Sequence, residues 1–377
     1  MRESKSKAIT RIIEKILISG GDLVKIFSKY NLGKLELKNR IVMAPMTRSR
    51  ATDNIPNDFM VTYYKQRADA GLIITEGTAP SANGVGYPRI PGIYNDDQIR
   101  GWKKITDAVH SKEGKIFLQL MHTGRVSHPE NMKSGTKIIA PSAIAMSGEM
   151  YTDTKGLQPY PVPQEMTLQD IEKTQDEFVR AARNAIEAGF DGVEVHGANG
   201  YLIDQFINPA SNHRNDGYGN SIQNRCRFAI EVAQKVADAI SAEKTGIRLS
   251  PYGVFNDMIV FDDIEQTYEY LADCLGKIKL AYIHIVNHSS MGAPEVPESV
   301  YQKIRKAFGG TIIASGGLDK GKAEKILEEE KADLAAFGRA FLSNPDLVNK
   351  MKYDLPLNKP DYDTFYTPGE KGYIDYP

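Results

Sequence analysis

The stretch "AGFDGVEVHGANGYLIDQF" (188–206) joins a strand pattern to a dense run of polar residues. Its segment "DGVEVHG" (191–197) alternates two apolar and two polar side chains, which predicts a strand with two different faces. His196, Asn199 and Tyr201 lie at the carboxyl end of that segment. If the neighbouring strands run parallel to it, this end belongs to the face where barrel enzymes carry their active sites.

Short β-rich runs alternate with longer helical patterns along the rest of the chain. The strand candidates are 40–45, 71–79, 114–122, 191–197, 245–251, 280–287, 310–317 and 332–339. The helical segments are 57–70, 96–112, 167–188, 222–242, 264–277, 298–308, 319–331 and 344–352. Eight such pairs predict a parallel sheet and favour a closed (β/α)8 TIM barrel over an open doubly wound sheet. The dinucleotide fingerprint GxGxxG is also absent after the first strand.

The starts of several helices and one long insertion are marked by composition. Asn57, Thr167, Ser221 and Asn344 are the expected helix N-caps. The segment 123–166 follows the third strand and is rich in Pro, Gly and Ser, so we expect a capping subdomain, with a hairpin, over the barrel mouth. Residues 23–377 are expected to form the barrel, with this cap inserted, and residues 1–22 an N-terminal helical extension.

Composition excludes several classes of protein. The chain has 377 residues, is 41% hydrophobic and 25% charged, and carries a net charge of −1, so no basic field for nucleic acid or acidic lipid is indicated. No apolar run approaches the ~20 residues of a membrane helix. Cys226 and Cys274 are far apart, which argues against a disulfide framework or a cysteine-held cluster and favours a cytoplasmic location. A transit peptide at residues 1–22 is disfavoured by Glu3 and Glu14.

Side chains alternate between the two faces of a strand, and three polar residues fall on the face opposite to the more aliphatic one. Gln119, His196 and Arg248 all lie near the carboxyl ends of their strands in this phase. Burying an arginine is costly unless it meets an anion or several acceptors. The pattern therefore predicts a bound polar or anionic ligand at the barrel mouth.

The last two strands end in glycine-containing turns. "ASGGLD" (314–319) and "AFGRAF" (336–341) place backbone N–H groups and Arg339 at the position where barrels bind phosphate. Alternatively, the glycines only turn the chain and Arg339 pairs with a surface carboxylate. The occurrence of both motifs on adjacent strands favours a phosphate site.

His196 and Asn199 can both donate hydrogen bonds. Two converging donors could polarise a carbonyl oxygen and stabilise an enolate formed from it. Tyr201 could donate a proton to carbon. The same spacing also fits a capping turn followed by a core helix, so spacing alone leaves both interpretations open.

Longer motifs carry a resemblance to a known family. They are "NRIVMAPMTRSRA" (39–51), "LIITEGT" (72–78), "FLQLMHTGRVSHP" (117–129), "APSAI" (140–144), "AGFDGVEVHGANGYLIDQFINPASNHRNDGYGNSIQNRCRF" (188–228), "IRLSP" (247–251), "AFGRAFLSNPDLV" (336–348) and "TFYTPGEKGYIDYP" (364–377). With these stretches the chain resembles the Old Yellow Enzyme family of FMN-dependent ene-reductases, in the branch of N-ethylmaleimide reductase and the plant oxophytodienoate reductases.

The resemblance implies an FMN-binding barrel and assigns its contacts. The implied cofactor residues are Pro45, Met46, Thr47, Gly77, Gln119, Arg248, Gly317, Gly338 and Arg339. Among them, Thr47 would hydrogen-bond the flavin carbonyl at C4, Gln119 the pyrimidine edge, and Arg248 the region of N1 and the C2 carbonyl. Gly77 would leave room beside the ring. The last three residues of the set would hold the phosphate.

The resemblance also implies a ping-pong reaction on an activated alkene such as an enone, a maleimide, a nitroalkene or a nitro ester. NADPH or NADH would reduce FMN, and flavin N5 would then deliver hydride to the substrate. His196 and Asn199 would bind the substrate carbonyl, Tyr201 would donate the proton, and Tyr366 would border the pocket. Many family members carry Trp where Met121 stands, so the pocket shape is expected to differ.

A second interpretation is a phosphate-binding lyase or aldolase on the same barrel. That chemistry usually needs a Schiff-base lysine or a metal cluster at the strand ends. No predicted strand ends in lysine, and His284 and His288 look isolated and structural. An amine dehydrogenase would need a longer chain with more cysteines, and a binding protein would not need the polar constellation. The partner is thus expected to be a small molecule, with no nucleic acid or membrane, and the protein a monomer or homo-oligomer.

Overall fold

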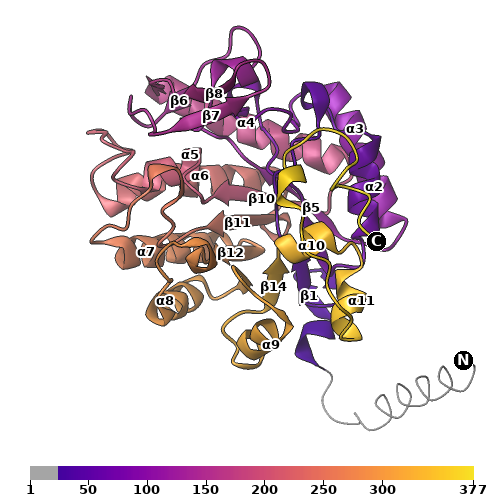
Figure 1. Cartoon of the computed structure of the whole chain (residues 1–377). Helices are drawn as coiled ribbons and strands as arrows, with labels where there is room; N and C mark the ends of the chain where they lie inside the picture. The colour runs from indigo at the N-terminus through magenta and orange to yellow at the C-terminus, as the bar shows by residue number, and fades with distance from the viewer. Residues whose placement is uncertain (1–23) are drawn as a thin grey trace, which may run out of the picture.

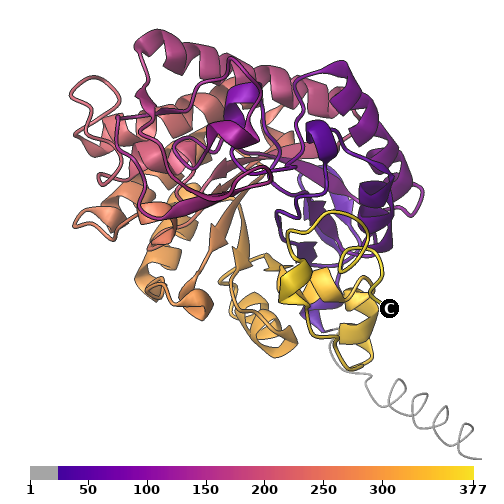
Figure 2. The same ribbon diagram turned by 45° about the horizontal axis from the view of Figure 1, so that its top comes forward.

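A computed structural model describes residues 24–377, so the predicted extension 1–22 lies outside the described residues. The central strands form a ring that the helices surround (Figures 1 and 2). All neighbouring strands in the ring are parallel, and they close in the order β10-β11-β12-β13-β14-β3-β4-β5. Their bounds are β3 Ile41–Met43, β4 Leu72–Ile74, β5 Ile116–Leu120, β10 Gly192–Gly197, β11 Thr245–Leu249, β12 Tyr282–Val286, β13 Thr311–Ser315 and β14 Leu334–Phe337. The predicted eight-stranded barrel is confirmed, with strands shorter than the apolar runs that predicted them.

Helices follow the strands as the periodicity predicts. The main ones are α2 Asp58–Gln66, α3 Asp96–His110, α4 Leu168–Glu187, α6 Ile222–Ile240, α7 Ile264–Ile278, α8 Glu298–Phe308, α9 Lys320–Glu328 and α11 Leu347–Lys352, with short α5 Leu202–Ile207 and α10 Arg339–Ser343. None of the helices within residues 24–377 combines the length and apolarity needed to cross a membrane.

Three of the four expected N-caps are confirmed. The side chains of Asn57, Thr167 and Ser221 each accept a backbone N–H in the first turn of their helix. Asn344 is not an N-cap: it ends α10, and α11 begins later, after Asp346. The Asn344 amide instead accepts the backbone N–H of Asn358 at 2.7 Å, because it lies between two short helices and holds the chain that passes over them.

The two faces of each strand enter different cores. Leu118, Val193 and Ile247 point outward into the large apolar cluster shared with the helices. Phe117 and Tyr282 point inward and fill the barrel interior. The polar side chains that point into the barrel therefore lie above this apolar interior, near the carboxyl ends of the strands.

A two-stranded sheet that the sequence analysis did not foresee lies at the opposite end of the barrel. It pairs β1 Tyr30–Leu32 with β2 Leu35–Leu37 in antiparallel register. Leu32 and Leu37 are buried against the interior cluster, and the Tyr30 hydroxyl lies 2.7 Å from Thr311 Oγ1 at the start of β13. Within residues 24–377, this sheet covers the amino end of the barrel, and the cavities that the predicted site residues line lie at the carboxyl end.

The insertion between β5 and α4 contains the expected hairpin. Strands β7 Glu149–Thr152 and β8 Gly156–Pro159 pair antiparallel, and the short strands β6 Ile139–Ala140 and β9 Gln164–Glu165 pair beside them. The hairpin stands to one side of the barrel in Figure 1. Several of its side chains line the cavity at the mouth.

Candidate active site

Two adjoining cavities open at the carboxyl ends of the strands. The first, of about 450 Å³, lies between the strand ends and the β7–β8 hairpin and is rich in tyrosine; we call it the aromatic cavity. The second, of about 800 Å³, extends along the ends of β13 and β14; we call it the glycine cavity. The residues that line both are Pro45, Thr47, Asn199, Arg248 and Tyr366. One continuous site is therefore built from strands on opposite sides of the barrel.

Every residue that the sequence analysis selected for the site lines one of these cavities. The aromatic cavity is lined by Pro45, Thr47, Gly77, Gln119, His196, Asn199, Tyr201, Arg248 and Tyr366. The glycine cavity adds Met46, Gly317, Gly338 and Arg339. The structure brings the predicted residues together, while the role of each one stays a prediction.

Arg248 is a buried cation whose guanidinium meets no acceptor within residues 24–377. It is 8% exposed, and its Nε is a buried donor without a hydrogen-bond partner. Burial lowers the pKa of Arg248, and the nearby Glu194 carboxylate opposes that shift. Because an unpaired buried donor is costly, the arrangement calls for a ligand with acceptor atoms or negative charge at this point.

A chain of hydrogen bonds crosses the barrel beneath this arginine. Gln119 Nε2 donates to Glu194 Oε1 at 2.7 Å, and Glu194 Oε2 lies 2.9 Å from His284 Nδ1. His284 Nε2 lies 3.0 Å from Ser315 Oγ. Since the Gln119 amide N–H is committed to Glu194, its carbonyl oxygen remains available to the cavity. His284 is thus a structural histidine, as the sequence analysis expected, but it is not isolated.

His196 is held as a neutral hydrogen-bond donor. Its Nδ1 accepts the backbone N–H of Ala198 at 3.3 Å, which leaves the ring proton on Nε2. Burial, and next the charge of Arg248, keep the pKa of His196 well below its usual value. A neutral imidazole with a free Nε2–H can donate to a ligand oxygen without carrying charge.

Asn199 is fixed on three sides. Its backbone has φ of 61°, a left-handed conformation that asparagine tolerates better than most residues. Its N–H donates to Ser250 Oγ at 2.9 Å, and its C=O accepts from Asn256 Nδ2 at 2.7 Å. Its side-chain Oδ1 lies 2.7 Å from His288 Nε2. His288, which the sequence placed outside any metal cluster, thus contacts a predicted site residue, because the loop after β12 returns to the mouth of the barrel.

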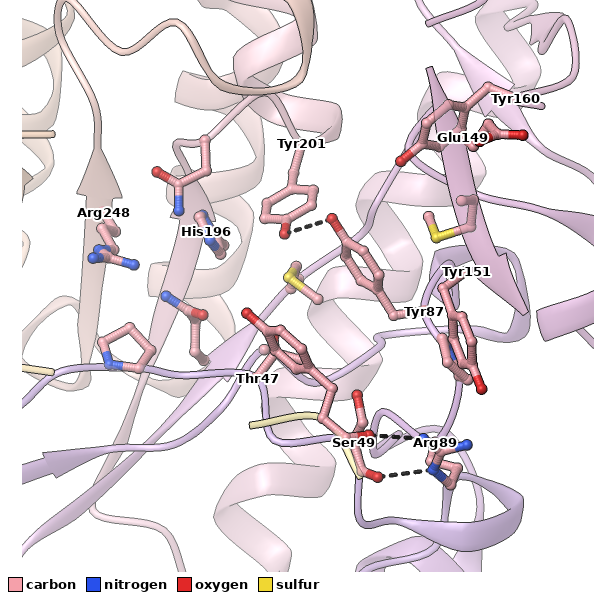
Figure 3. Close-up of a pocket in the computed structure, with 18 of the residues that line it drawn as sticks. Thr47, Ser49, Tyr87, Arg89, Glu149, Tyr151, Tyr160, His196, Tyr201 and Arg248 are labelled. Carbon is pink, nitrogen blue, oxygen red and sulfur yellow. Dashed lines mark hydrogen bonds between the residues drawn. The ribbon is translucent and has the colours of Figure 1, made fainter. Parts of the chain in front are cut away.

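Tyr201 stands directly before α5 and points toward the aromatic cavity (Figure 3). Its hydroxyl lies 3.2 Å from the hydroxyl of Tyr87, and its ring meets His196 edge-on with centroids 4.9 Å apart. Burial raises the pKa of Tyr201 to about 12. The phenol therefore keeps its proton at neutral pH, as a proton donor must.

A buried carboxyl group anchors the turn between β10 and α5. Asp204 accepts the backbone N–H of Gly200 at 2.8 Å and the hydroxyl of Ser250 at 3.3 Å. Gln205 Nε2 donates to Gly200 O at 2.7 Å from the other side. These bonds hold Asn199 and Tyr201 in place relative to each other.

The glycine cavity has the backbone shape expected of an anion cradle. Gly316 and Gly317 have φ of 119° and 62°. A Cβ on Gly316 would lie 1.9 Å from Asn287 O, so only glycine fits there. Arg339 opens α10 and forms no ion pair with any described carboxylate, so the alternative of a surface pair receives no support. The phosphate interpretation remains a prediction that this geometry fits.

The sequence analysis missed the outer wall of the aromatic cavity. Tyr87, Tyr151 and Tyr160 line it, together with Arg89 (Figure 3). Arg89 Nε donates to Ser49 O at 2.9 Å, and the side chain forms an ion pair with Asp153 in the hairpin turn. Tyr87 lies in the Gly- and Pro-rich loop that follows the carboxyl end of β4. Since such loops form the active-site face of a barrel, this position could have identified Tyr87 as a site residue. The hairpin residues carried no such signal.

Tyr366 reaches the site because two buried arginines clamp the carboxyl-terminal tail. Arg48 donates to Gly372 O at 2.6 Å, and Arg50 donates to Phe365 O and Thr364 O, each at 2.7 Å. Both arginines follow Thr47 on the loop after β3. The same loop therefore carries one predicted cofactor contact and holds the segment with Tyr366.

The site lacks the groups that a lyase or aldolase would use. No lysine lines either cavity, and no group of His, Cys, Asp and Glu within residues 24–377 has the geometry of a metal site. The arrangement offers two neutral donors, a protonated phenol and an unpaired guanidinium around one space. Such a set suits a ligand whose oxygen gains negative charge during reaction.

Comparison with known proteins gives consistent matches. The model of the NADH:flavin oxidoreductase / NADH oxidase family matches residues 25–358. The putative 12-oxophytodienoate reductase 3 of Oryza sativa subsp. japonica is 44% identical over 361 residues, which cover 94% of this chain and 92% of that protein. The probable flavin mononucleotide-dependent alkene reductase of Leishmania infantum is 42% identical over 351 residues, covering 92% of this chain and 95% of that protein.

Solved structures agree with the sequence matches. Morphinone reductase superimposes with a TM-score of 0.91 at 42% identity, covering 93% of this chain and 96% of that chain. The Old Yellow Enzyme homologue from Zymomonas mobilis has a TM-score of 0.89 at 39% identity, covering 94% of this chain and 99% of that chain. These matches confirm the predicted barrel and flavin oxidoreductase class, and they give the lyase no support. The chain therefore belongs to the NADH:flavin oxidoreductase / NADH oxidase family, as an FMN-dependent oxidoreductase of the Old Yellow Enzyme type.

Proposed function

We propose that this enzyme reduces the activated C=C bond of α,β-unsaturated carbonyl compounds, with FMN as cofactor and NADPH or NADH as hydride donor. The observation that carries the proposal is the meeting of His196, Asn199 and Tyr201 in one cavity that Arg248 also lines. The similar proteins support it, since they include an oxophytodienoate reductase, an alkene reductase and morphinone reductase.

The described residues fit FMN. Arg248 has an unpaired buried Nε, which suits an acceptor-rich ring edge that gains negative charge. We assign Gln119 and Thr47 to the pyrimidine portion of the ring, and backbone contacts to Pro45 and Met46. At Gly77 a Cβ would meet Met121 Sδ at 2.4 Å, so the absence of a side chain there lets Met121 pack directly against the backbone at the cavity wall. Gly317, Gly338 and Arg339 are assigned to the phosphate.

Bound FMN supplies the redox step, because it takes hydride from a nicotinamide and passes it to the alkene. The chain supplies binding, orientation and the proton. His196 Nε2–H and the Asn199 amide would hold the carbonyl oxygen and stabilise the negative charge that it gains. Tyr201 O–H would protonate the α-carbon, with Tyr87 as its hydrogen-bond partner.

The aromatic cavity supports a compact substrate. Part of its volume of about 450 Å³ is lined by residues that we assign to the flavin ring. The remaining space under the tyrosine-rich wall fits a ring-sized enone or maleimide better than a long chain. Met121 occupies the position where many family members carry Trp, and it packs with Val85 and Ile90 beside the cavity. We propose cyclic enones and maleimides as the first substrates to test, with nitroalkenes and nitrate esters as further candidates.

We also place the enzyme in the cytoplasm. The support is the pair of free cysteines, Cys226 and Cys274, which suits a reducing compartment. Cell fractionation with an antibody would test the location, and recovery in an oxidising compartment would contradict it. A monomer or a homo-oligomer is compatible with the active site, since all of its assigned residues come from one chain.

The decisive test is spectroscopic. The purified protein should be yellow with the bands of oxidised flavin. Anaerobic NADPH or NADH should bleach the flavin band, and 2-cyclohexenone should restore it, with one equivalent of cyclohexanone formed. A protein that takes up no FMN, or a bleached flavin that no enone, maleimide or nitroalkene reoxidises, would refute the proposal.

A further inference from the structure

His288 contacts the side chain of Asn199 from a distant part of the chain. It lies on the loop after β12, and its Nε2 is 2.7 Å from Asn199 Oδ1. The His288 ring packs against Phe255 with centroids 4.5 Å apart, and only 9% of the residue is exposed. His288 is therefore held behind the Asn199 amide by packing as well as by this hydrogen bond.

The direction of that hydrogen bond decides which end of the amide faces the substrate. If His288 Nε2–H donates to Oδ1, the Asn199 NH₂ group is left for the cavity. No acceptor within residues 24–377 contacts this NH₂ group. If the amide were turned around, its oxygen would face the carbonyl oxygen of a substrate and repel it.

The surroundings keep His288 neutral, so that its single ring proton lies on either Nδ1 or Nε2. Burial, and next the charge of Arg248, lower the pKa of His288 to about 4. The Arg248 guanidinium is the other charged group facing this loop from the barrel wall, and the packed Phe255 ring adds no polar contact. Because the atom that faces Nε2 is the amide oxygen of Asn199, which can only accept, a hydrogen bond at this contact requires the proton on Nε2.

We propose that His288 is a positioning residue that donates from Nε2 to Asn199 Oδ1 and thereby aims the Asn199 NH₂ group at the carbonyl oxygen of the substrate. The inference rests on the proposed function in one respect, namely that Asn199 binds the substrate oxygen. It makes the site selective for acceptor groups, such as carbonyl and nitro oxygens, over groups that present a donor. Donation into the amide also polarises it and strengthens the N–H as a donor.

The first test uses a double-mutant cycle. His288→Leu removes the donor and should lower kcat/KM for 2-cyclohexenone about tenfold. His288→Gln retains an N–H donor and should recover most of that loss. In the Asn199→Ala background, His288→Leu should have no further effect, because its effect passes through the missing amide. The exposed His213→Leu is the control and should leave kcat/KM and FMN content unchanged.

A further tenfold loss on adding His288→Leu to Asn199→Ala would overturn the inference, since His288 would then act through general structure. FMN content of each variant, read from the flavin band, shows whether the site is intact. If His288→Leu loses FMN, the cycle is run with His288→Phe, which also lacks the donor but keeps a ring against Phe255.

The second test does not depend on turnover. ¹⁵N NMR of the resting holoenzyme labelled at histidine should show His288 with its proton on Nε2, and the signal is assigned by its loss in His288→Gln. An unprotonated Nε2 would overturn the inference whatever the enzyme reduces. A wild-type enzyme that reduces no enone would refute the proposed function, and the tautomer would still decide the donor role of His288.

Discussion

At the scale of single residues, the site works through groups that stay neutral until reaction. His196 is a neutral donor because burial holds its pKa down, and Tyr201 remains protonated because burial holds its pKa up. Arg248 supplies the only charge among the three, and its Nε has no acceptor within residues 24–377. In the proposed function, this division separates binding of the oxygen, protonation of carbon and stabilisation of the cofactor.

Replacing Tyr201 with phenylalanine tests the proton donor. Tyr201→Phe removes the hydroxyl and should slow enone reduction by about 10²–10⁴-fold, the usual contribution of a positioned general acid. Flavin bleaching by NADPH should stay close to wild type, because that step needs no proton from the phenol. Stopped-flow measurement of both half-reactions checks this, with the exposed Tyr353→Phe as control. Equal slowing of the two half-reactions would contradict the role of Tyr201.

The pH dependence of enone reduction follows from the same residue. Tyr201 acts in its protonated form, so activity is present below its folded pKa and is lost as pH rises toward about 12. His196 acts in its neutral form, which its lowered pKa preserves down through mildly acidic pH. We expect a flat profile across neutral pH for the enone half-reaction measured by stopped flow. A fall in rate centred near the ordinary histidine pKa of about 6.5 would show that His196 is not held neutral.

At the scale of elements, loops that join distant segments shape the site. The loop after β3 carries Thr47 into the cavity and then sends Arg48 and Arg50 into the carboxyl-terminal tail. The hairpin of the insertion closes the outer wall and is tied to the rest by the ion pair of Arg89 and Asp153. These ties fix the position of aromatic side chains that no strand carries.

Loss of a clamp arginine should loosen the tail. Arg50→Met removes the hydrogen bonds to the carbonyls of Thr364 and Phe365, each of which keeps one other donor. The expected cost is therefore about 0.5–1.5 kcal/mol for each hydrogen bond lost. We expect a lower Tm, faster proteolysis within the tail and a raised KM for 2-cyclohexenone, because Tyr366 loses its fixed position. The exposed Arg100→Met is the control. Unchanged proteolysis would show that other contacts hold the tail.

The turn after β13 should tolerate only glycine at its first position. Gly316→Ala places a Cβ against Asn287 O on a backbone with φ of 119°, so the turn must shift. We expect reduced FMN content and a lower Tm, measured by absorbance and thermal unfolding. Gly321→Ala lies in α9, where a Cβ meets nothing closer than 3.5 Å, and should raise stability by up to about 1 kcal/mol. Full FMN content in Gly316→Ala would place the phosphate elsewhere.

At the scale of the whole molecule, the cofactor should stabilise the closed barrel. Its assigned contacts come from β5, β11 and the ends of β13 and β14, on opposite sides of the ring. Removing FMN should lower Tm, and FMN at ~100 times its Kd should restore about 2.7 kcal/mol of stability. Thermal unfolding of apoprotein titrated with FMN checks this. A Tm that does not depend on FMN concentration would contradict the expectation that FMN binds the folded barrel and not the unfolded chain.

Much of the barrel and of its inner site follows from local sequence patterns. The alternation in "DGVEVHG" placed His196 and Glu194 on one face, and the register pairs His196 with Arg248 on the next strand, as parallel strand ends require. The apolar runs located all eight strands, because each run is buried on both faces. Interactions between residues that are close in the sequence determine these features. Each strand and its inward-facing residues can therefore be predicted from its own segment.

Contacts between segments far apart in the chain were decided only by the tertiary structure. Examples are the hydrogen bond of His288 to Asn199, the clamp of Arg50 on the tail, and the hairpin tyrosines at the outer wall. Asn344, expected as a helix cap, was taken up by such a contact with Asn358. Sequence by itself thus determined the barrel, the family and the inner polar residues. The outer wall, the path of the tail and the orientation of the Asn199 amide were decided only when the loops folded against one another. The physical reason is that a hydrogen bond between distant segments produces no periodic pattern in the sequence of either segment.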